Sequence, residues 1–472
     1  MAFNEKGQWE VERKLVAISD FSAGERLNPG DIFNIPAWKR IENGYIDEDG
    51  FLNGRPHAIP ITGSLSNLRG LAISNNNTLL TVADNSIYDG NTPISSLLGS
   101  GVVSYDTSRQ KTIITAGRKP VIIESVGIIS MTEDNVYAVA SFQGNKYRLC
   151  IVQSDNPRSC KISAIGDLTD FGEVIIDTDG FNDEYTEGIV IYNFPYDIVD
   201  VVEYKGSFIF LTKQAIFKLE HDVGETGIQL QLQRVRDIEI WDVKARKYQG
   251  SIVFMNSQGI WIYGETPQGI ELNKLPMNGV DLVLLKEIVN GEASINLDTQ
   301  RKLLYLTPSL NSGYSRVFHF DKKLWTKWDL PIFDLVEINS EVYCTVIDND
   351  KVVRLDNNPS PTVDEPYDMI LLSGLNDFDG TRSRKRYIWM GLEINTEDEF
   401  EYYLDVLPDS IPSTLPNPLT EKITKIENPL ECYIGSQSVR GSIYMLFRNY
   451  GKFVLNNAYL DMKIKKPRIG LA

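Results

Sequence analysis

The chain has 472 residues, of which 42% are hydrophobic and 24% charged, and its formal net charge is −17. This length exceeds one ordinary hydrophobic core, and the apolar content excludes a wholly disordered chain. The acidic balance argues against a protein that binds nucleic acid through patches of Lys and Arg, but it suits a conduit that a polyanion passes without sticking. Solubility alone is the simpler explanation of such a charge.

Residues 1–62 contain two strand-like segments, Lys14–Ser19 and Ile32–Ile35, with turn residues such as Asn28-Pro29-Gly30 between them. They form no complete repeating unit, so we expect this segment to add strands to a platform domain. The first residues lack the basic start and apolar run of a signal peptide, and no stretch approaches about 18 consecutive apolar residues. We therefore expect a chain that folds in a cytosol and has no membrane span.

From Leu68 onward a β-rich unit returns in degenerate form: two runs of alternating apolar residues, a turn between them, and a short closing strand. The clearest copies are Ile198–Glu220, Gly250–Gly264 and Phe333–Asp356, and looser copies are Leu68–Asp89, Val126–Val152 and Lys302–Leu330. Such units bury their apolar faces only by stacking around an axis. The pattern predicts an all-β fold with a degenerate β-propeller of about six blades over residues 63–358; two β-sandwich domains in series are the alternative.

The amino-acid composition changes after Asp356, where the segment Asn357-Asn358-Pro359-Ser360-Pro361 is typical of a linker. Five further strands are expected beyond it, with Tyr387–Ile394 and Glu401–Val406 paired, followed by Leu430–Ile434, Ser442–Phe447 and Tyr459–Ile464. The stretch Pro408–Pro429 is rich in Pro and Ser. We expect residues 359–472 to form a small β-sandwich or platform domain, to which residues 1–62 contribute.

No catalytic motif is present, since phosphate-binding, nucleophile-elbow and zinc-protease patterns are all missing. The acidic turn with Asp177, Asp179 and Asp183 is the best metal candidate, but its glycine comes too early for a calcium-binding loop, and a solvated turn explains it as well. The four cysteines form no C-x-x-C pair, and the three histidines are scattered. The sequence therefore predicts free thiols, no catalytic residue, no metal and no cofactor.

Two basic clusters stand out in this acidic chain and lie outside the predicted blades. They comprise Arg382, Arg384, Lys385 and Arg386 ahead of Tyr387, and Lys463, Lys465, Lys466 and Arg468 near the C-terminus. Contact with an acidic neighbouring subunit or with DNA phosphates is one interpretation. Protection of an exposed strand edge is the other. The pair Trp325 and Trp328, by contrast, is expected to pack inside a blade.

Three phrases give the chain a resemblance to a known family: Asp197–Glu220, Val317–Leu330 and Glu341–Asp356. In this order and at this length they resemble the packaged-DNA stabilisation proteins of short-tailed bacteriophages, also called tail hub or nozzle proteins. The resemblance covers roughly residues 70–356 and includes no invariant motif. It implies a propeller with a β-rich platform, assembled as a hexamer in the virion tail after synthesis in the host cytoplasm. It implies no site residue, because this family works through interfaces.

The expected function is therefore that of a structural virion protein and not of an enzyme. The resemblance implies a ring below the portal adaptor that retains the packaged genome and forms part of the ejection channel. The implied partners are the portal-adaptor ring, tail fibre, tailspike or needle proteins, and double-stranded DNA passing through without sequence-specific binding. The alternative is a carbohydrate-binding or glycan-cleaving propeller of a tail fibre, and a monomeric signalling scaffold is a third reading.

Overall fold

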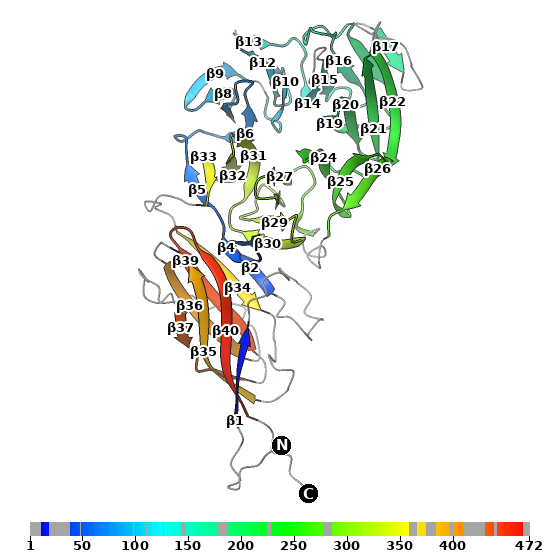
Figure 1. Ribbon diagram of the computed structural model, residues 1–472. Helices are drawn as coiled ribbons and strands as arrows, with labels where there is room; N and C mark the ends of the chain where they lie inside the picture. Colours follow the sequence, from blue (N-terminus) through cyan, green and yellow to red (C-terminus); the bar gives the residue numbers. More distant parts are fainter. Residues whose placement is uncertain are drawn as a thin grey trace, which may run out of the picture.

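A computed structural model describes the chain in seventeen stretches. They are residues 11–17, 38–47, 49–97, 99–108, 111–125, 127–142, 148–172, 174–177, 187–223, 228–267, 269–276, 286–357, 366–373, 384–396, 400–408, 430–438 and 441–465. Within them the fold is all-β. Figure 1 shows a β-propeller joined end to end to a β-sandwich.

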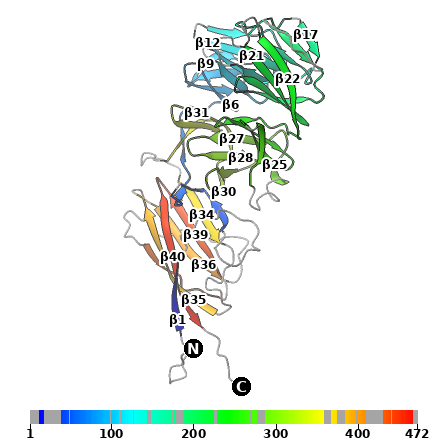
Figure 2. The same ribbon diagram turned by 45° about the vertical axis from the view of Figure 1, so that its right-hand side comes forward.

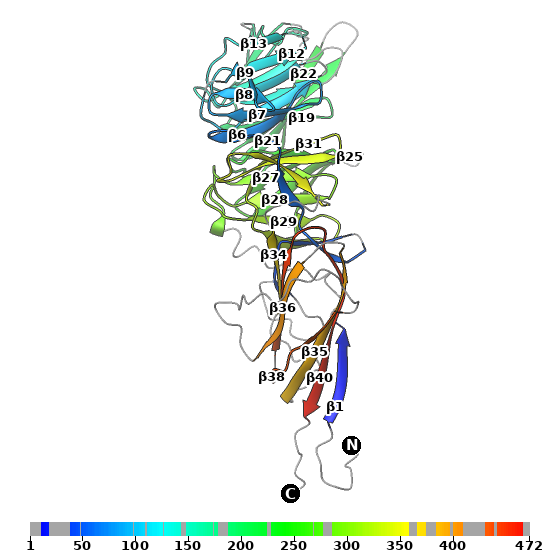
Figure 3. The same ribbon diagram turned by 90° about the vertical axis from the view of Figure 1, so that its left-hand side faces the viewer.

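The described residues form seven propeller blades, each a small sheet that runs outward from the axis. The first three blades contain β6 (Leu68–Ile73), β7 (Leu79–Ala83), β8 (Ser86–Asp89) and β9 (Thr92–Ser96); β10 (Ser104–Ser108), β11 (Lys111–Thr115), β12 (Val121–Glu124) and β13 (Gly127–Ser130); and β14 (Val136–Ser141), β15 (Leu149–Gln153), β16 (Cys160–Ile162), β17 (Val174–Asp177) and β18 (Ile189–Tyr192). In Figure 3 the propeller is seen as a disc from its side.

The remaining four blades complete the ring. They contain β19 (Ile198–Tyr204), β20 (Ser207–Thr212), β21 (Ala215–Val223) and β22 (Ile228–Asp237); β23 (Arg246–Tyr248), β24 (Ser251–Asn256), β25 (Gly259–Thr266) and β26 (Gly269–Lys274); β27 (Ser294–Asp298), β28 (Leu303–Thr307), β29 (Ser315–His319) and β30 (Leu324–Trp328); and β31 (Ile332–Ile338), β32 (Glu341–Val346), β33 (Val352–Asp356) and β5 (His57–Pro60).

The seventh blade takes its outermost strand from the other end of the chain. Strand β5 pairs antiparallel with β33, so that His57 lies opposite Asp356 and Pro60 opposite Val353. The expected boundary at residue 62 therefore falls after the first propeller strand instead of before it. A four-residue strand with a proline at its end gives too weak a pattern for its partner, almost 300 residues away, to be foreseen. Its pairing closes the ring and covers the edge of the last blade.

The structure has one blade more than the expected number of about six. The second blade, β10–β13, was not foreseen, because the spacing rule assumed roughly 40 to 70 residues for each blade. Blades one and two together occupy only residues 68–130. Their strands have four to six residues and their turns are short. Under the assumed spacing, residues 68–130 were therefore counted as one blade followed by a long loop.

Tight turns between the first two strands of three blades explain why the clearest repeats were visible in the sequence. The central residues of these turns are Lys205-Gly206, Gln249-Gly250 and Asn339-Ser340, and all six have positive φ. Two successive residues with positive φ are typical of a type I′ turn. The twist of this turn matches the twist of the two strands that it joins in a β-hairpin. These turns fix the register of β19 with β20, β23 with β24 and β31 with β32.

The sandwich is built from both ends of the chain. One sheet contains β1 (Val11–Ala17), β3 (Gly44–Ile46), β4 (Leu52–Gly54), β35 (Arg384–Asn395), β37 (Leu430–Tyr433), β38 (Gln437–Ser438) and β40 (Val454–Lys465). The facing layer contains β2 (Trp38–Glu42), β34 (Tyr367–Ser373), β36 (Phe400–Pro408) and β39 (Gly441–Asn449). Figure 3 shows the two layers side by side, and their shared core includes Tyr387, Met445 and Leu460.

The expected strands Tyr387–Ile394 and Glu401–Val406 both form, as β35 and β36, but they do not pair with each other. Strand β35 pairs with β40, and β36 pairs with β39 in the opposite layer. Both segments carry apolar residues that a strand of either layer can bury on its core side. Their composition therefore located the strands without saying which layer each joins. The expected strand Ile32–Ile35 and residues 409–429 lie outside the described residues.

One continuous sheet joins the propeller to the sandwich. Strand β30 of the sixth blade pairs in parallel with β2, so the sheet runs β27-β28-β29-β30-β2-β34-β39-β36. An ion pair between Lys327 Nζ and Glu42 Oε1 (3.2 Å) spans the joint. Leu324 of the same blade packs into the core of the sandwich. The view in Figure 2 shows the two bodies in line, with β30 and β34 between their centres.

Candidate functional site

An aspartate or asparagine recurs at the third residue of four inner strands around the propeller axis. The residues are Asp106 in β10, Asp200 in β19, Asn296 in β27 and Asp334 in β31. In β19 and β31 the strand pairing shifts register at the same point. A β-bulge re-aims the side chain that it carries. The bulges therefore coincide with aspartates that turn toward neighbouring blades.

The three aspartates, Asp106, Asp200 and Asp334, each join two consecutive blades through both carboxylate oxygens. The Oδ1 atoms accept the N–H of the next residue in their own strand, at 2.8 Å from Thr107, 2.9 Å from Val201 and 3.0 Å from Leu335. The Oδ2 atoms accept an N–H from the following blade, at 2.6 Å from Ser141, 3.0 Å from Ala245 and 2.8 Å from Leu71. The last contact closes the ring from the seventh blade to the first.

Glycine makes room for that closing contact. A Cβ atom on Gly70 would lie 3.0 Å from Asp334 Oδ2 and 2.9 Å from the Cβ of Val103. A contact below about 3.4 Å forces the neighbouring atoms to move, and here both neighbours are packed. Only the smallest residue therefore allows β6 to approach the seventh blade closely enough for the bond to Leu71.

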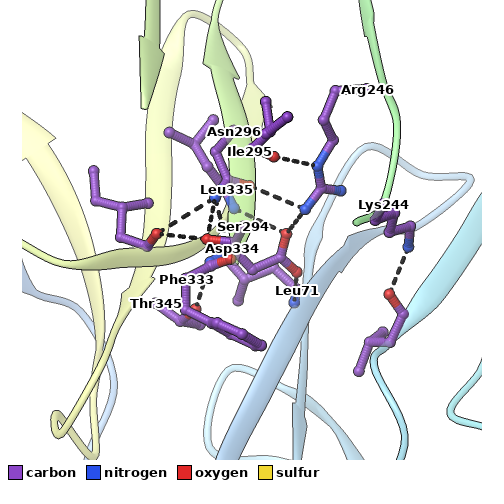
Figure 4. Close-up of polar contacts among 12 residues, drawn as sticks. Leu71, Lys244, Arg246, Ser294, Ile295, Asn296, Phe333, Asp334, Leu335 and Thr345 are labelled. Atoms are coloured by element: carbon purple, nitrogen blue, oxygen red, sulfur yellow. Dashed lines mark hydrogen bonds and ion pairs between the residues drawn. The ribbon is translucent and has the colours of Figure 1, made fainter. Parts of the chain in front are cut away.

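Two cations from the fifth blade cross the axis. Arg246 donates from Nη2 to Asp334 Oδ1 (2.6 Å) and to Asn296 Oδ1 (3.0 Å), and from Nε to the carbonyl oxygen of Ile295 (2.9 Å). Lys244 Nζ donates to the carbonyl oxygen of Val103 (2.5 Å), just before the second blade. Figure 4 shows Arg246 directed to Asp334 and Lys244 directed to a separate contact. The centre of the propeller is thus spanned by side chains.

The electrostatics of the axis follow from this crowding. Burial raises the pKa of Asp106 and Asp200, while nearby lysines and the backbone N–H groups work in the opposite direction. Burial, reinforced by the charge of Arg246, lowers the pKa of Lys244 to about 8. Both carboxylate oxygens of each of the three aspartates accept a backbone N–H group, so the strands that these side chains join hold them in place.

Two cavities of the propeller share Lys244 in their lining. A cavity of about 290 Å³ is lined by residues such as Asp106, Glu203 and Glu337, and one of about 430 Å³ by residues such as Tyr137 and Asp242. Volumes of this size accommodate a small molecule. A DNA duplex cannot pass along the axis of one propeller while Lys244 and Arg246 cross it.

The predicted metal candidates gain no support from the described residues. Asp177 ends strand β17, whereas Asp179 and Asp183 lie outside the described residues. Within the ranges given above, no group of three or more His, Cys, Asp or Glu side chains is arranged to bind a metal. All four cysteines are free thiols, and Cys150, Cys160 and Cys344 are buried.

The basic clusters meet on one face of the sandwich. Arg384 and Arg386 on β35 and Lys463 on β40 are exposed, and Arg386 lies opposite Lys463 in the register. Lys385 differs, because it is only 1% exposed and points to the interior side of the sheet with Tyr387. This burial keeps its side chain from a neighbouring subunit or from DNA. Lys465 pairs with Arg384 through the backbone, and Arg382, Lys466 and Arg468 lie outside the described residues.

The junction between the two bodies is densely bonded. Asn43 donates its backbone N–H to the carbonyl oxygen of Lys327 (2.8 Å) and its Nδ2 to that of Asp368 (2.7 Å), which joins the sixth blade to β34. Arg55 pairs with Asp329 (2.9 Å), and its guanidinium lies 4.3 Å from the ring centroid of Tyr367. These contacts fix the propeller and the sandwich as one body.

A histidine at this junction makes stability depend on pH. His319 is 3% exposed and stacks on Tyr45 at 6.4 Å, and burial lowers its pKa to about 3. The unfolded chain binds this proton near pH 6.5, so the contribution is complete above that pH and is lost as the pH falls toward 3. We expect the free energy of unfolding to fall by about 1.4 kcal/mol per pH unit from this group. Urea unfolding between pH 7 and 4.5 measures it, and His319→Gln should flatten the dependence; equal slopes would contradict the assignment.

The aspartate network was missed by the sequence analysis, although a signal for it existed. The repeats around Asp200 and Asp334 read Ile-Val-Asp-Val-Val-Glu and Ile-Phe-Asp-Leu-Val-Glu, with the acidic residues in the same places. Alignment of the two copies would have singled out a charged residue inside a buried strand, which is unusual unless it is paired. The expectation for Trp325 and Trp328 is confirmed, since both are fully buried in blade cores.

The comparisons with known proteins concern only the fold. No protein-family model matches the chain, and no curated protein matches its sequence. Solved structures that resemble it include a chain of the mitotic checkpoint complex (9% identity, TM-score 0.36, covering 64% of this chain and 94% of that one) and the AfRom2 CNH domain (8%, 0.38, 64% and 99%).

A third similar structure is Hsv2 of Kluyveromyces lactis (11% identity, TM-score 0.32, covering 52% of this chain and 70% of that one). Likenesses at these TM-scores carry no argument about activity. None of the described residues forms a helix with the length and apolar character that crossing a bilayer requires. The order of strands in its own sheets identifies the chain as a β-propeller protein with an appended β-sandwich.

Proposed function

We propose that this chain is a structural virion protein, a tail hub or nozzle subunit of a short-tailed bacteriophage. Several copies form a ring, a hexamer in our proposal, below the portal adaptor. The ring retains the packaged genome and later forms part of the ejection channel. The sequence resemblance over residues 70–356 motivates this proposal, and the character of the propeller axis supports it.

The single observation that carries the proposal is that the aspartates around the propeller axis hydrogen-bond neighbouring blades to each other. Asp106, Asp200 and Asp334 each bond two consecutive blades, and Arg246 adds a third contact to Asp334. A glycan-cleaving propeller, the alternative, requires two carboxylates that are free to approach the scissile bond. A subunit that bears load requires the opposite, a ring of blades that cannot separate. The same rigidity continues through β30 and β2 into the sandwich.

The path of the DNA follows from the closed axis. Because Lys244 and Arg246 cross the centre of the propeller, the genome would pass through the space enclosed by several copies. The net charge of −17 would keep the wall of that channel from binding the polyanion. Contacts with the portal adaptor and with fibre, tailspike or needle proteins belong to the proposal as well, and their surfaces are to be sought outside the blades.

The mass of the purified protein in solution tests the proposal. Light scattering is measured alone and after addition of a capsid extract that lacks this protein. We expect the protein to join the particle, either as a ring of several copies that forms beforehand or as a monomer that assembles only there. A stable monomer that ignores particles would contradict the proposal, and the next step would then be a screen for glycan binding or cleavage.

A further inference from the structure

The outer face of the first sandwich sheet combines exposed cations, which have no carboxylate partner among the described residues, with one exposed and two half-buried aromatic rings. We name it the cation–aromatic face and define it by Arg384, Arg386 and Trp389 of β35, Tyr433 of β37, and Tyr459 and Lys463 of β40. The neighbouring residues Tyr387, Met462 and Ile464 alternate with these and are buried in the sandwich core. This alternation places Arg384, Arg386, Tyr459 and Lys463 on the side away from the core. The register shift between Tyr387 and Trp389 brings Trp389 to the same side, where its ring meets Tyr459. The hydrogen bond from Arg386 places Tyr433 there as well.

The cations of this face lie where the sheet itself disfavours them. Arg386 is directly opposite Lys463, and Arg384 is opposite Lys465. Like charges in directly opposed positions on neighbouring strands are destabilising. In the described part of the chain, no carboxylate forms an ion pair with Arg384, Arg386 or Lys463. Most other cations that the structure describes in β-strands do have such a partner, as Arg448 has in Asp368 (2.8 Å).

The aromatic side chains lie together beside the cations. Tyr459 lies across β35 at Gly391, where an added Cβ atom would be 2.0 Å from the ring. Trp389 meets the same ring edge-on, with 5.5 Å between the centroids. Tyr433 is 70% exposed, and its hydroxyl accepts a hydrogen bond from Arg386 Nη2 (3.3 Å). At the edge of the sheet, Leu15 of β1 is 63% exposed.

Tyr, Trp and Arg side chains that are exposed or half-buried on one face are typical of protein–protein interfaces, in which aromatic anchors provide the contact area and charged residues fix the register. The cations specify an acidic partner. This chain offers one, because residues 63–358 contain 38 Asp and Glu against 27 Lys and Arg, a formal charge of −11. Opposite charges on two copies would attract each other, while the acidic surfaces elsewhere would repel.

We infer that the cation–aromatic face binds the acidic surface of a second copy of this chain. The inference rests on the proposed ring and identifies the face that would form it. The two sides of such a contact differ, so the interface is heterologous, which is the type that closes into rings. Carboxylates of the neighbouring copy would bind Arg386 and Lys463. Their negative charge would offset the repulsion between these two cations.

Duplex DNA is the competing occupant, and the composition of the face argues against it. Three exposed cations neutralise few phosphates, whereas DNA-binding proteins of useful affinity contact many. Exposed rings such as Tyr433 stack on unpaired bases but not on the outside of a duplex. DNA binding is therefore an outcome that the test must be able to reveal.

The test compares three proteins by light scattering and by sedimentation with capsid particles. They are the unchanged chain, the double variant Arg386→Glu with Lys463→Glu, and the control Arg236→Glu with Lys274→Glu. The control changes the net charge by the same amount at exposed positions on the outer strands β22 and β26. All substitutions are at exposed sites, and circular dichroism confirms that each protein is folded.

We expect the double variant to need at least a tenfold higher concentration than the unchanged chain to associate, while the control associates normally. The inference would be overturned if the double variant assembled like the control, or if the unchanged chain never bound another copy, alone or on particles. The inference would also be overturned if the double variant still formed the ring but no longer bound a duplex DNA probe, because the face would then bind DNA. Rings that depend on this face but ignore particles would leave the inference intact and remove the proposed function.

Discussion

Replacing Asp334 with Ala is expected to lower the free energy of unfolding by about 3 to 5 kcal/mol, since one partner of a buried, hydrogen-bonded ion pair is removed. The carboxylate accepts the N–H groups of Leu71 and Leu335, and it pairs with Arg246 at 2.6 Å. Its loss leaves two buried donors and a guanidinium without this acceptor at the point where the ring closes. The seventh blade should separate from the first more readily than any other pair.

Urea unfolding followed by circular dichroism measures this effect, and two further variants make it specific. Asp350→Ala changes an exposed aspartate of the same blade and should alter stability by less than about 0.5 kcal/mol. Asp334→Asn preserves the volume but turns one acceptor into a donor, and it removes the charge that faces Arg246. We expect it to be almost as damaging as Ala. An Asn variant as stable as the unchanged protein would show that the ion pair does not close the ring.

The sequence predicted the fold class because its signal is local. Alternation over a few residues, with turns of positive φ at Lys205-Gly206 and Asn339-Ser340, identifies a hairpin without knowledge of the rest of the chain. The aromatic pair at Trp325 and Trp328 was equally readable, since large apolar side chains in a strand are buried whatever the topology. These features specify strands and turns, and the propeller follows from their repetition.

Pairings between distant segments were not predictable in the same way. Strand β5 joins β33, and β2 joins β30, although nothing in the short segments at residues 38–60 distinguishes these partners from many other edges. The same limit applies to Lys385. A run of basic residues suggests an exposed surface, but in a strand every second residue faces the opposite side, and Lys385 falls on the buried side.

The basic residues of the cation–aromatic face were predictable from the sequence, but their positions in the fold were not. Two basic clusters about 80 residues apart in the chain were both foreseen. Their meeting in the register of β35 with β40, where Arg386 faces Lys463, depends on which strands pair. The aromatic part of the same face was not foreseen, because Tyr433 and Tyr459 lie on different strands and become neighbours of Trp389 only in the folded sheet.

Replacing Trp328 with Ala is expected to separate the unfolding of the two bodies. Trp328 is fully buried, donates from Nε1 to the carbonyl oxygen of Gly44 (3.1 Å), and lies edge-on to Tyr305 at 5.3 Å. Truncating a buried Trp to Ala costs about 3 to 5 kcal/mol. Because its hydrogen bond reaches β3 of the sandwich, we expect this variant to lose the coupling between the bodies in addition to stability.

Differential scanning calorimetry distinguishes this loss of coupling from simple destabilisation. The matched control is Trp325→Ala in the same strand, a residue just as buried whose Nε1 donates to Pro276 inside the propeller. Both variants should melt earlier, but only Trp328→Ala should show two transitions where the unchanged protein shows one. Coincident melting of both bodies in Trp328→Ala would mean that the continuous sheet through β30 and β2 suffices for coupling. Two transitions would place the stiffness of the subunit in the packing at this junction, where force along its length must pass.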